Sequence, residues 1–484
     1  MNRELKRISI LVVVMFGILF GATSVIQVFQ VDNLRADSRN VRTLYQSYSA
    51  QRGSILVDGQ PIAESVPSDD IYKYQRTYPG GDLYSSVTGY LTIGGEPTGV
   101  EGALNDELSG TANSQFFDQI GSIFTGKKQQ GDSVELTLDP VVQQAAYDAL
   151  GDQQGAIVAI EPATGRILAL VSKPGFDPNT LSVHDGAAAE QAYQSLIDDP
   201  VQPLANRAIG GTLNPPGSTF KLIVSAAALE SGQFTPDSEF PNPVSFPLPG
   251  STATVTNAGG DACGPGETAT LATGLRLSCN TIFAEVGLQL GEERIADMAT
   301  GFGFGKDLSI PMRVTPSSYP RGLDDAQLAL SAFGQYEDRA TPLQMAMVSA
   351  GIANGGTVMK PTLIDQILSP DLTVEQEFQA EEFSTPISGN TSATLTQMMV
   401  QNVENGAGSN ARMDGISVAG KTGTAQNGGD DPYTLWFTGF APADNPEVAV
   451  AVVVENGGGL GQTGFGNLVA APIARQVFEA VLNR

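Results

Sequence analysis

A serine and a lysine stand three residues apart in the stretch NPPGSTFKLI, residues 214–223. The serine, Ser218, is a weak nucleophile until a base takes its proton. Histidine is the usual base, but the chain holds a single histidine, His184, in a polar run with no triad motif around it. If Ser218 does chemistry, its base is therefore expected to be a lysine or a carboxylate, and Lys221 is the candidate nearest in sequence.

The residues around Ser218 predict a helix that starts at the serine. Pro215, Pro216 and Gly217 interrupt any preceding element, and STFKLIVSAAALE then carries a helical pattern. Residues i and i+3 are neighbours on a helix face, so Lys221 is expected to reach back to the Ser218 oxygen. The positive end of a helix and burial both disfavour the ammonium form, which lowers the lysine pKa and makes the neutral amine available as a base. A solvated helix lysine is the alternative, because Ser-x-x-Lys also occurs by chance.

A second polar triplet, Ser278-Cys279-Asn280, precedes a helical pattern in RLSCNTIFAEVG. One interpretation makes Ser278 a proton relay and Asn280 an amide that holds the lysine and the substrate. The other makes these residues helix N-caps, a position that Ser and Asn favour. Cys279 follows Cys263 by sixteen residues, and outside a reducing compartment we expect a disulfide between them, with two buried thiols as the alternative. Closing such a loop would stabilise the fold by about 3 kcal/mol.

A third motif, Lys421-Thr422-Gly423-Thr424, lies on a predicted strand in VAGKTGTAQ. Glycine inside a strand often marks the close approach of another backbone, here predicted to be a peptide substrate that runs antiparallel to the strand. Lys421 and Thr422 are then expected to meet a substrate carboxylate. The backbone N–H groups of Ser218 and Thr424 are the expected oxyanion donors. An ordinary strand followed by a turn is the alternative.

The composition excludes several classes of protein. With 26 Lys and Arg against 52 Asp and Glu, the net charge is −26, so the chain has no cationic excess to neutralise nucleic-acid phosphates. One histidine and two cysteines argue against a Cys/His zinc site, and we predict neither a metal nor a cofactor. His184 itself is predicted to lie in a solvated loop. A length of 484 residues predicts two or three domains.

The first residues predict a membrane anchor. Residues 8–29 carry no charge and are long enough to span a bilayer core of about 30 Å. Arg3, Lys6 and Arg7 precede them, which favours a cytoplasmic amino terminus and a single crossing, with residues 31–484 outside the cytoplasm. The alternative is a cleaved signal peptide, for which the small residues at 21–23 could serve as a cleavage site.

The remaining patterns predict an α+β chain in three parts. These are a cytoplasmic tip and transmembrane anchor (1–30), a small elongated membrane-proximal module (31–130) and a catalytic domain (131–484). Asp58-Gly59 predicts a tight turn between two short strands, and Asp139-Pro140 predicts a helix start.

The catalytic domain is predicted to contain one antiparallel sheet. Two apolar runs joined by EPATGR predict a hairpin over 155–174, before a helical block from 218 to about 356. Three more strands and a helix over about 471–482 follow it. This order favours a sheet of about five strands, assembled from distant parts of the chain and flanked by helices.

The three motifs occur in the order Ser-x-x-Lys, Ser-x-Asn, Lys-Thr-Gly, which resembles the penicillin-binding proteins. NRAIGGTLNPPGSTFK (206–221), ATPLQMAMVSAGIANGG (340–356) and TLWFTGFAP (434–442) resemble the family's catalytic domain, and RGSILVDGQPIAES (52–65) and GVEGALNDELSG (99–110) resemble the membrane-proximal module of class B members. The resemblance covers nearly the whole chain. It implies the penicillin-binding and serine β-lactamase-like transpeptidase fold, an antiparallel five-stranded sheet flanked by helices.

The resemblance also implies a D,D-transpeptidase that cross-links peptidoglycan stem peptides. The serine matching Ser218 attacks the peptide bond between two D-alanines and passes the resulting acyl group to the amine of a second peptide. The implied roles are proton acceptor for Lys221, relay and positioning for Ser278 and Asn280, carboxylate binding for Lys421 and Thr422 beside Gly423, and oxyanion hole for the N–H groups of Ser218 and Thr424. β-Lactams mimic the D-alanyl pair and are expected to acylate Ser218.

Two alternatives stay open. A D,D-carboxypeptidase uses the same site but passes the acyl group to water, and a β-lactam sensor or silent scaffold also fits the motifs. Nothing before residue 130 resembles a glycosyltransferase domain, and no Glu-bearing deacylation loop is evident, which disfavours a bifunctional class A enzyme and a β-lactamase. The expected partners are the cytoplasmic membrane, a membrane glycosyltransferase and elongation or division proteins.

Overall fold

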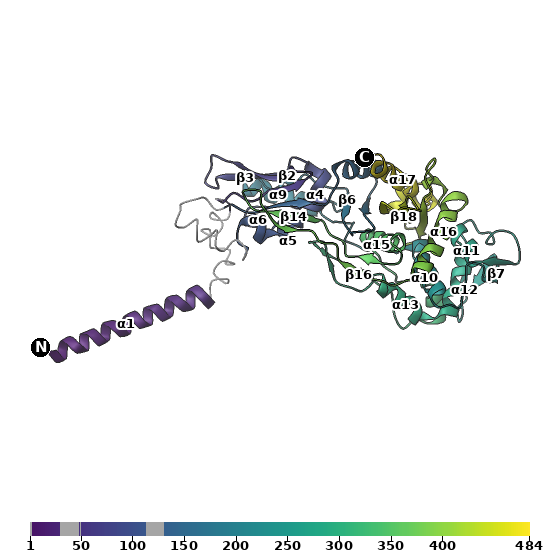
Figure 1. Cartoon of the computed structure of the whole chain (residues 1–484), viewed down its shortest axis with the longest axis horizontal. Helices are drawn as coiled ribbons and strands as arrows, with labels where there is room; N and C mark the ends of the chain where they lie inside the picture. The colour runs from purple at the N-terminus through teal and green to yellow at the C-terminus, as the bar shows by residue number, and fades with distance from the viewer. Residues whose placement is uncertain (1, 30–47, 49, 113–129) are drawn as a thin grey trace.

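The computed structural model describes residues 2–29, 48, 50–112 and 130–484 (Figure 1). The helices are α1 Asn2–Phe29, α4 Ser85–Thr88, α5 Gly99–Ala103, α6 Asn105–Ser109, α8 Pro140–Leu150, α9 Gly186–Ile197, α10 Lys221–Glu230, α11 Leu271–Leu277, α12 Asn280–Leu290, α13 Glu292–Gly301, α14 Asp325–Ser331, α15 Pro342–Ala353, α16 Gly389–Asn405 and α17 Ala470–Leu482. Short 3-10 turns are η1 Gly81–Tyr84, η3 Pro178–Thr180, η4 Gly217–Thr219, η5 Ser409–Ala411, η6 Asn456–Gly459 and η7 Gly461–Thr463.

The strands are β1 Ile55–Val57, β2 Gln60–Pro67, β3 Tyr74–Thr77, β4 Ser133–Leu136, β5 Gly155–Ile160, β6 Ile167–Lys173, β7 Glu239–Pro241, β8 Ser245–Pro247, β9 Thr254–Thr256, β10 Thr268–Thr270, β11 Leu308–Ser309, β12 Arg313–Val314, β13 Val358–Met359, β14 Ile364–Leu368, β15 Val374–Glu377, β16 Glu382–Ser384, β17 Ala419–Ala425, β18 Thr434–Ala441 and β19 Val448–Val454.

The predicted five-stranded antiparallel sheet is confirmed. Its order is β17-β18-β19-β5-β6, so the hairpin near residue 160 pairs with the last strand of the chain through β5 and β19. These strands are rich in β-branched and small apolar residues, which suit a sheet covered on both faces. The strand β17 lies at one edge of this sheet and leaves one side unpaired.

Helices cover both faces of this sheet, because successive strand residues point to opposite sides. On one face Ala449, Ala451 and Val453 of β19 pack in the core that includes α10 and α15. On the other face Val450 and Val452 lie in a second core, in which α17 packs on β19 and α8 packs on β5 and β6. The predicted helix start at Asp139 is confirmed, since its carboxylate accepts hydrogen bonds from the backbone N–H groups of residues 141 and 142.

A second sheet, with strand order β15-β14-β4-β1-β2-β3, lies at the end of the body opposite α10 to α13 (Figure 1). The predicted turn at Asp58-Gly59 joins β1 and β2, and both residues have positive φ, at 50° and 68°. The sheet also takes in β4, β14 and β15, which come from beyond residue 130. The membrane-proximal module therefore shares both a sheet and a continuous core with the rest of the chain.

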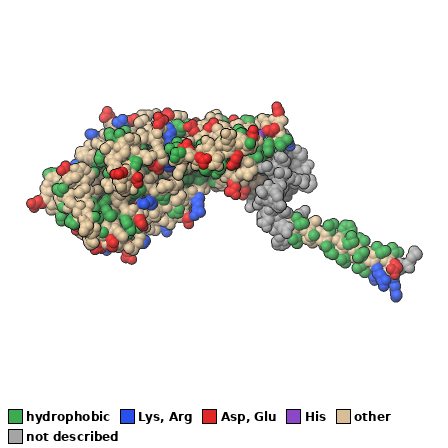
Figure 2. All heavy atoms as spheres, turned by 180° about the vertical axis from the view of Figure 1, so that it is seen from behind, with side chains coloured by type: hydrophobic (Ala, Val, Ile, Leu, Met, Phe, Trp, Pro, Cys, Tyr) green, Lys and Arg blue, Asp and Glu red, His purple; other side chains and the backbone are tan. Residues whose placement is uncertain are grey.

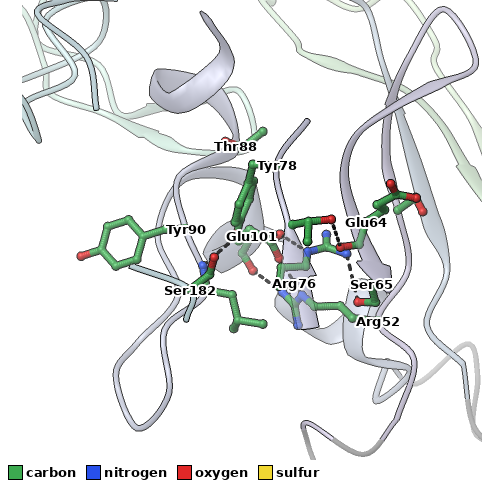
Figure 3. Close-up of polar contacts among 12 residues, drawn as sticks. Arg52, Glu64, Ser65, Arg76, Tyr78, Thr88, Tyr90, Glu101 and Ser182 are labelled. Carbon is green, nitrogen blue, oxygen red and sulfur yellow. Dashed lines mark hydrogen bonds and ion pairs between the residues drawn. The ribbon is translucent and has the colours of Figure 1, made fainter. Parts of the chain in front are cut away.

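A buried ionic cluster fastens this module (Figure 3). The carboxylate of Glu101 in α5 accepts from Arg52 Nε at 2.6 Å and from Arg76 Nε at 2.5 Å. Arg52 also donates to the Glu101 carbonyl at 2.6 Å, and Arg76 donates to the Gly53 carbonyl at 2.8 Å. The Glu101 side chain is fully buried and the two arginines nearly so. The cluster therefore joins α5 and β3 to the segment that leads into β1.

Helix α1 is long and apolar enough to cross a bilayer. The candidate span is Arg3–Ile26, 24 residues, and an 18-residue window within it has a mean hydropathy of 2.5. Figure 2 shows its apolar side chains uncovered, with Lys and Arg gathered at its first residues. No other helix in the described parts of the chain passes the same test, so the fold fits a single-pass membrane anchor. The predicted boundary near residue 30 lies outside the described residues.

Two sequence-based predictions differ from the structure. The block from 218 to 356 is mainly helical, but it also holds three small two-stranded sheets, made by the pairs β7-β10, β8-β9 and β11-β12. The solvated position predicted for His184 is wrong. Its side chain is 12% exposed, its Nδ1 pairs with Asp70, and its ring centroid lies 4.7 Å from that of Tyr72. Asp70 lies 114 residues earlier in the chain, and such a distant partner leaves no local sequence signal.

Candidate active site

Ser218 lies in the 3-10 turn η4, immediately before α10. The turn rests on β17, because a Cβ at Gly217 would stand 3.1 Å from the Thr424 carbonyl oxygen. Gly217 also has a φ of +53°, a conformation that favours glycine. Its N–H donates to the Gly334 carbonyl at 2.9 Å. The half-buried Ser218 is thus held beside the Lys-Thr-Gly strand, although the two segments are some 200 residues apart in sequence.

Lys221 begins α10 and is fully buried. Its Nζ donates to the Ser278 carbonyl and to Asn280 Oδ1, each at 2.8 Å. These two bonds account for both N–H groups of a neutral amine and leave its lone pair free. Burial, and then the charge of Lys421, lower the pKa of Lys221 well below its ordinary value.

Ser218 and Lys221 both lie in the described part of the chain, but they do not form the predicted hydrogen bond with each other. The two acceptors on the Ser278-Asn280 turn hold the Lys221 amine instead. The predicted lowering of the Lys221 pKa is correct in direction, and burial is its main cause. The second cause is the charge of Lys421 rather than the helix end. The predicted contact of Asn280 with the lysine is confirmed.

Ser278 connects the two lysines of the site. It ends α11 in the left-handed conformation, with φ 63° and ψ 40°, which is uncommon for a residue with a Cβ. Its Oγ accepts a hydrogen bond from Lys421 Nζ at 2.7 Å, while its carbonyl accepts from Lys221. The predicted disulfide between Cys263 and Cys279 is present and clamps the next residue. The unusual backbone of Ser278 aims one oxygen at each amine.

Lys421 lies on β17 and is also fully buried. Besides Ser278 Oγ, its Nζ donates to the Thr422 carbonyl at 2.7 Å. Burial lowers the pKa of Lys421 to about 7. Like charges in a shared low-dielectric site disfavour each other, so the charge of Lys421 adds to burial in lowering the pKa of Lys221. Both effects favour the neutral amine of Lys221, the form that can accept a proton.

Another backbone segment approaches Gly423 closely, as predicted, but that segment is not a peptide substrate. A Cβ there would stand 2.9 Å from the Pro216 carbonyl and 3.1 Å from Thr219 Cγ2. The neighbour is therefore the chain's own turn before α10. Thr422 is 7% exposed and donates to the Ala407 carbonyl at 3.1 Å. Thr424 Oγ1 accepts from the Gly466 N–H at 3.2 Å, and in the described part of the chain its own hydrogen has no acceptor.

Asn402 contacts the end of α11 next to Ser278, and the sequence analysis did not predict this residue as part of the site. It is fully buried on α16, and its Nδ2 donates to the last carbonyls of α11, at Leu275 and Arg276. The N–H of Ala407, shortly after α16, donates to the same Arg276 carbonyl. This segment links the end of α11, next to Ser278, with Thr422 on β17. An asparagine in a helix that already carries many polar residues is a weak signal, and no spacing rule indicates its partners.

Comparisons with known proteins fit this geometry. Residues 155–479 match the family described as penicillin binding protein transpeptidase domain. The chain belongs to this family. It is a class B member, and residues 52–134 match the penicillin binding protein A dimerisation domain.

The relatives extend the family match to the whole chain. The peptidoglycan D,D-transpeptidase PbpA of Mycolicibacterium smegmatis is 42% identical over 491 residues, covering 100% of this chain and 99% of that protein. PbpA of Mycobacterium tuberculosis is 40% identical with the same coverage.

Solved structures of the family share the fold. Penicillin-binding protein A from M. tuberculosis, solved as a ceftriaxone acyl-enzyme complex, has a TM-score of 0.87 at 39% identity. It covers 90% of this chain and 100% of its own. The penicillin G acyl-enzyme of the same protein has a TM-score of 0.85 at 40% identity, with the same coverage.

Proposed function

We propose that this chain is a peptidoglycan D,D-transpeptidase whose nucleophile is Ser218. The observation that carries the proposal is the buried Lys221 amine, one turn along from Ser218 and held on the Ser278-Asn280 turn. The relatives named D,D-transpeptidase and the acyl-enzyme structures of the family support the same chemistry.

In the first step, the neutral amine of Lys221 takes the proton of Ser218 Oγ. The oxygen attacks the carbonyl carbon between two D-alanines, the peptide bond breaks, and the departing D-alanine takes a proton as its amine forms. In the second step, the amine of another stem peptide attacks the ester carbon. A new peptide bond forms, the ester breaks, and Ser218 recovers its proton. A β-lactam would open its ring on Ser218 in the same first step.

The donor peptide is proposed to lie along β17. This strand is at the edge of the sheet, so an extended peptide can add to it as a further strand. The N–H groups of Ser218 and Thr424 would hold the oxyanion. The terminal carboxylate would bind at Thr424, above the charge of Lys421, and at Thr422 once its hydroxyl turns away from the Ala407 carbonyl. Thr424 supports this assignment, since its hydroxyl hydrogen has no acceptor among the described residues.

We propose a cell-membrane location with α1 as the anchor and the catalytic domain outside the cytoplasm. The domain division at residues 30 and 130 remains our proposal, with residues 131–484 as the catalytic part. Class B members have no glycosyltransferase domain of their own. A membrane glycosyltransferase and elongation or division proteins are therefore the proposed partners.

The experiment that tests the proposed function is product analysis. The full chain in detergent is given a stem pentapeptide ending in D-Ala-D-Ala and an amine acceptor, and products are separated by mass. We expect cross-linked product that is lost after penicillin treatment. Free D-alanine without cross-linked product would replace the proposal with a carboxypeptidase, and neither product would overturn both.

The pH dependence of acylation is expected to be bell-shaped. Below the pKa of Lys221 the base is protonated and acylation falls. Above about 7, where the pKa of Lys421 lies, the second lysine loses the charge that attracts the β-lactam carboxylate. The second-order rate constant for fluorescent penicillin, measured from pH 5 to about 9, checks this. A rate that climbs steadily through neutral pH in the wild type, or an alkaline limb unchanged in Lys421→Gln, would contradict the assignment.

A further inference from the structure

The four residues before Ser218, here called the approach segment (214–217), form few backbone hydrogen bonds through their own N–H groups. Two of them, Pro215 and Pro216, have no N–H to donate. The Pro215 carbonyl accepts from Trp436 Nε1 at 2.9 Å, and the Asn214 carbonyl accepts from the Ala340 N–H at 3.0 Å. At its other end, Gly217 donates to Gly334. The approach segment is thus held by separate hydrogen bonds to different elements rather than by the regular hydrogen bonds of a β-sheet.

The only charged group that holds the approach segment, among the described residues, is the carboxylate of Glu455, directly after β19. Its Oε1 accepts from Asn214 Nδ2 at 3.0 Å. Its Oε2 accepts from Arg207 Nε at 3.1 Å and from Gln154 Nε2 at 2.6 Å. The Glu455 side chain is 16% exposed and that of Arg207 is 6% exposed. Charge-assisted bonds in such a position are short and directional.

The partners of Glu455 are themselves fixed. Arg207 donates to the backbone carbonyls of residues 201, 202 and 205, so its guanidinium is already oriented. The amide of Asn214 is oriented at both ends, because its Oδ1 accepts from Thr434 Oγ1 at 3.2 Å. Glu455 therefore connects the end of β19 to a residue only four positions before the nucleophile.

We propose that Glu455 is a positioning residue for Ser218, acting through Asn214. The inference rests on the proposed role of Ser218 and adds a residue that touches neither substrate nor reacting atoms. Because Pro215 and Pro216 stiffen the approach segment, a shift at Asn214 is passed on to η4. Misplacing a nucleophile by about 1 Å can lower a rate by about 100-fold.

The test exchanges donor and acceptor across the Glu455–Asn214 bond. Asn214→Asp places two carboxylates face to face, and Glu455→Gln removes the charge. In the double variant, the new amide at position 455 can donate to the new carboxylate at position 214, while the amide oxygen still accepts from Arg207. Single-turnover acylation of the full chain by fluorescent penicillin gives the binding constant and the acylation rate constant separately. Active-site titration corrects for any unfolded fraction.

We expect the acylation rate constant to fall by about 10-fold in Glu455→Gln and by about 100-fold in Asn214→Asp, with the binding constant little changed. The double variant is expected to recover to within about 5-fold of the wild type. Glu447→Gln, at the exposed opposite end of β19, is the matched control and should acylate normally.

Two results would overturn the inference. One is single variants whose titrated sites acylate at the wild-type rate, which leaves Glu455 a merely structural role. The other is a double variant no faster than the slower single one. If Asn214→Asp does not fold, Glu455→Gln compared with Glu447→Gln decides the question alone. Failure of the proposed function would look different, because then the wild type would not label or Ser218→Ala would label equally.

Discussion

Ser218→Ala is expected to abolish covalent labelling by a fluorescent penicillin. Ser218 lies in a turn beside β17, three residues before the buried amine of Lys221, whose pKa is lowered. The neighbouring hydroxyl of Thr219 is fully buried and donates to the Pro216 carbonyl at 2.6 Å. Without the Oγ atom of Ser218 there is no oxygen to form the ester, whatever the binding pocket retains. The measurement is gel fluorescence after incubation, with mass spectrometry to locate the adduct on a peptide that contains residue 218.

The matched control for this prediction is Ser225→Ala. Ser225 lies on α10 seven residues after Ser218, is fully buried, and its Oγ has no hydrogen-bond partner among the described residues. Its removal should leave both folding and labelling near the wild-type level. Equal labelling of Ser218→Ala and the wild type would show that another residue is acylated, and the assignment of the nucleophile would be wrong.

The large sheet was predictable because its strands have a clear pattern in the sequence. Every residue of β5, β18 and β19 is buried, and each strand is a nearly continuous apolar run bounded by turn residues. The second sheet was not predictable in the same way. The strand β15 is exposed along its whole length and β14 is mostly half-buried, so neither has a clear pattern. The pairing of β14 with β4 depends on contacts across more than 200 residues, which single-sequence periodicity does not encode, and β15 joins the sheet only through β14.

The residues of the site also differ in how well the sequence predicts them. Ser218, Ser278 and Lys421 belong to motifs whose residue types suggest chemistry, and the structure brings them together. Asn402 and Glu455 belong to no motif, and their hydrogen bonds reach residues more than 120 positions away. No sequence pattern indicates that Lys421 would lower the pKa of Lys221, since that effect needs both amines on Ser278.

Glu101→Ala is expected to lower the free energy of unfolding by about 3–5 kcal/mol. The substitution leaves Arg52 and Arg76 as buried charges without their carboxylate, and breaking one side of a buried ion cluster has this magnitude. Tyr78 would also lose its hydrogen bond to Glu101 Oε1. Because the two sheets share one core, the loss should appear in the main urea transition of the whole extramembrane body. Glu96→Ala, an exposed change in the same module, should stay within about 0.5 kcal/mol of the wild type.

The pH dependence of this loss distinguishes charge from packing. Burial alone would raise the pKa of Glu101, but the charges of Arg76 and Arg52 outweigh it, and the pKa lies below its ordinary value of 4.5. A carboxyl with a depressed pKa contributes stability that is fully present above 4.5 and is lost as the pH falls through its lower folded value. The difference in free energy of unfolding between the wild type and Glu101→Ala should therefore become smaller as the pH falls below 4.5 and through the folded-state pKa of Glu101. If this difference in free energy of unfolding stays constant down to strongly acidic pH, then lost packing, rather than the unpaired arginines, destabilises the variant.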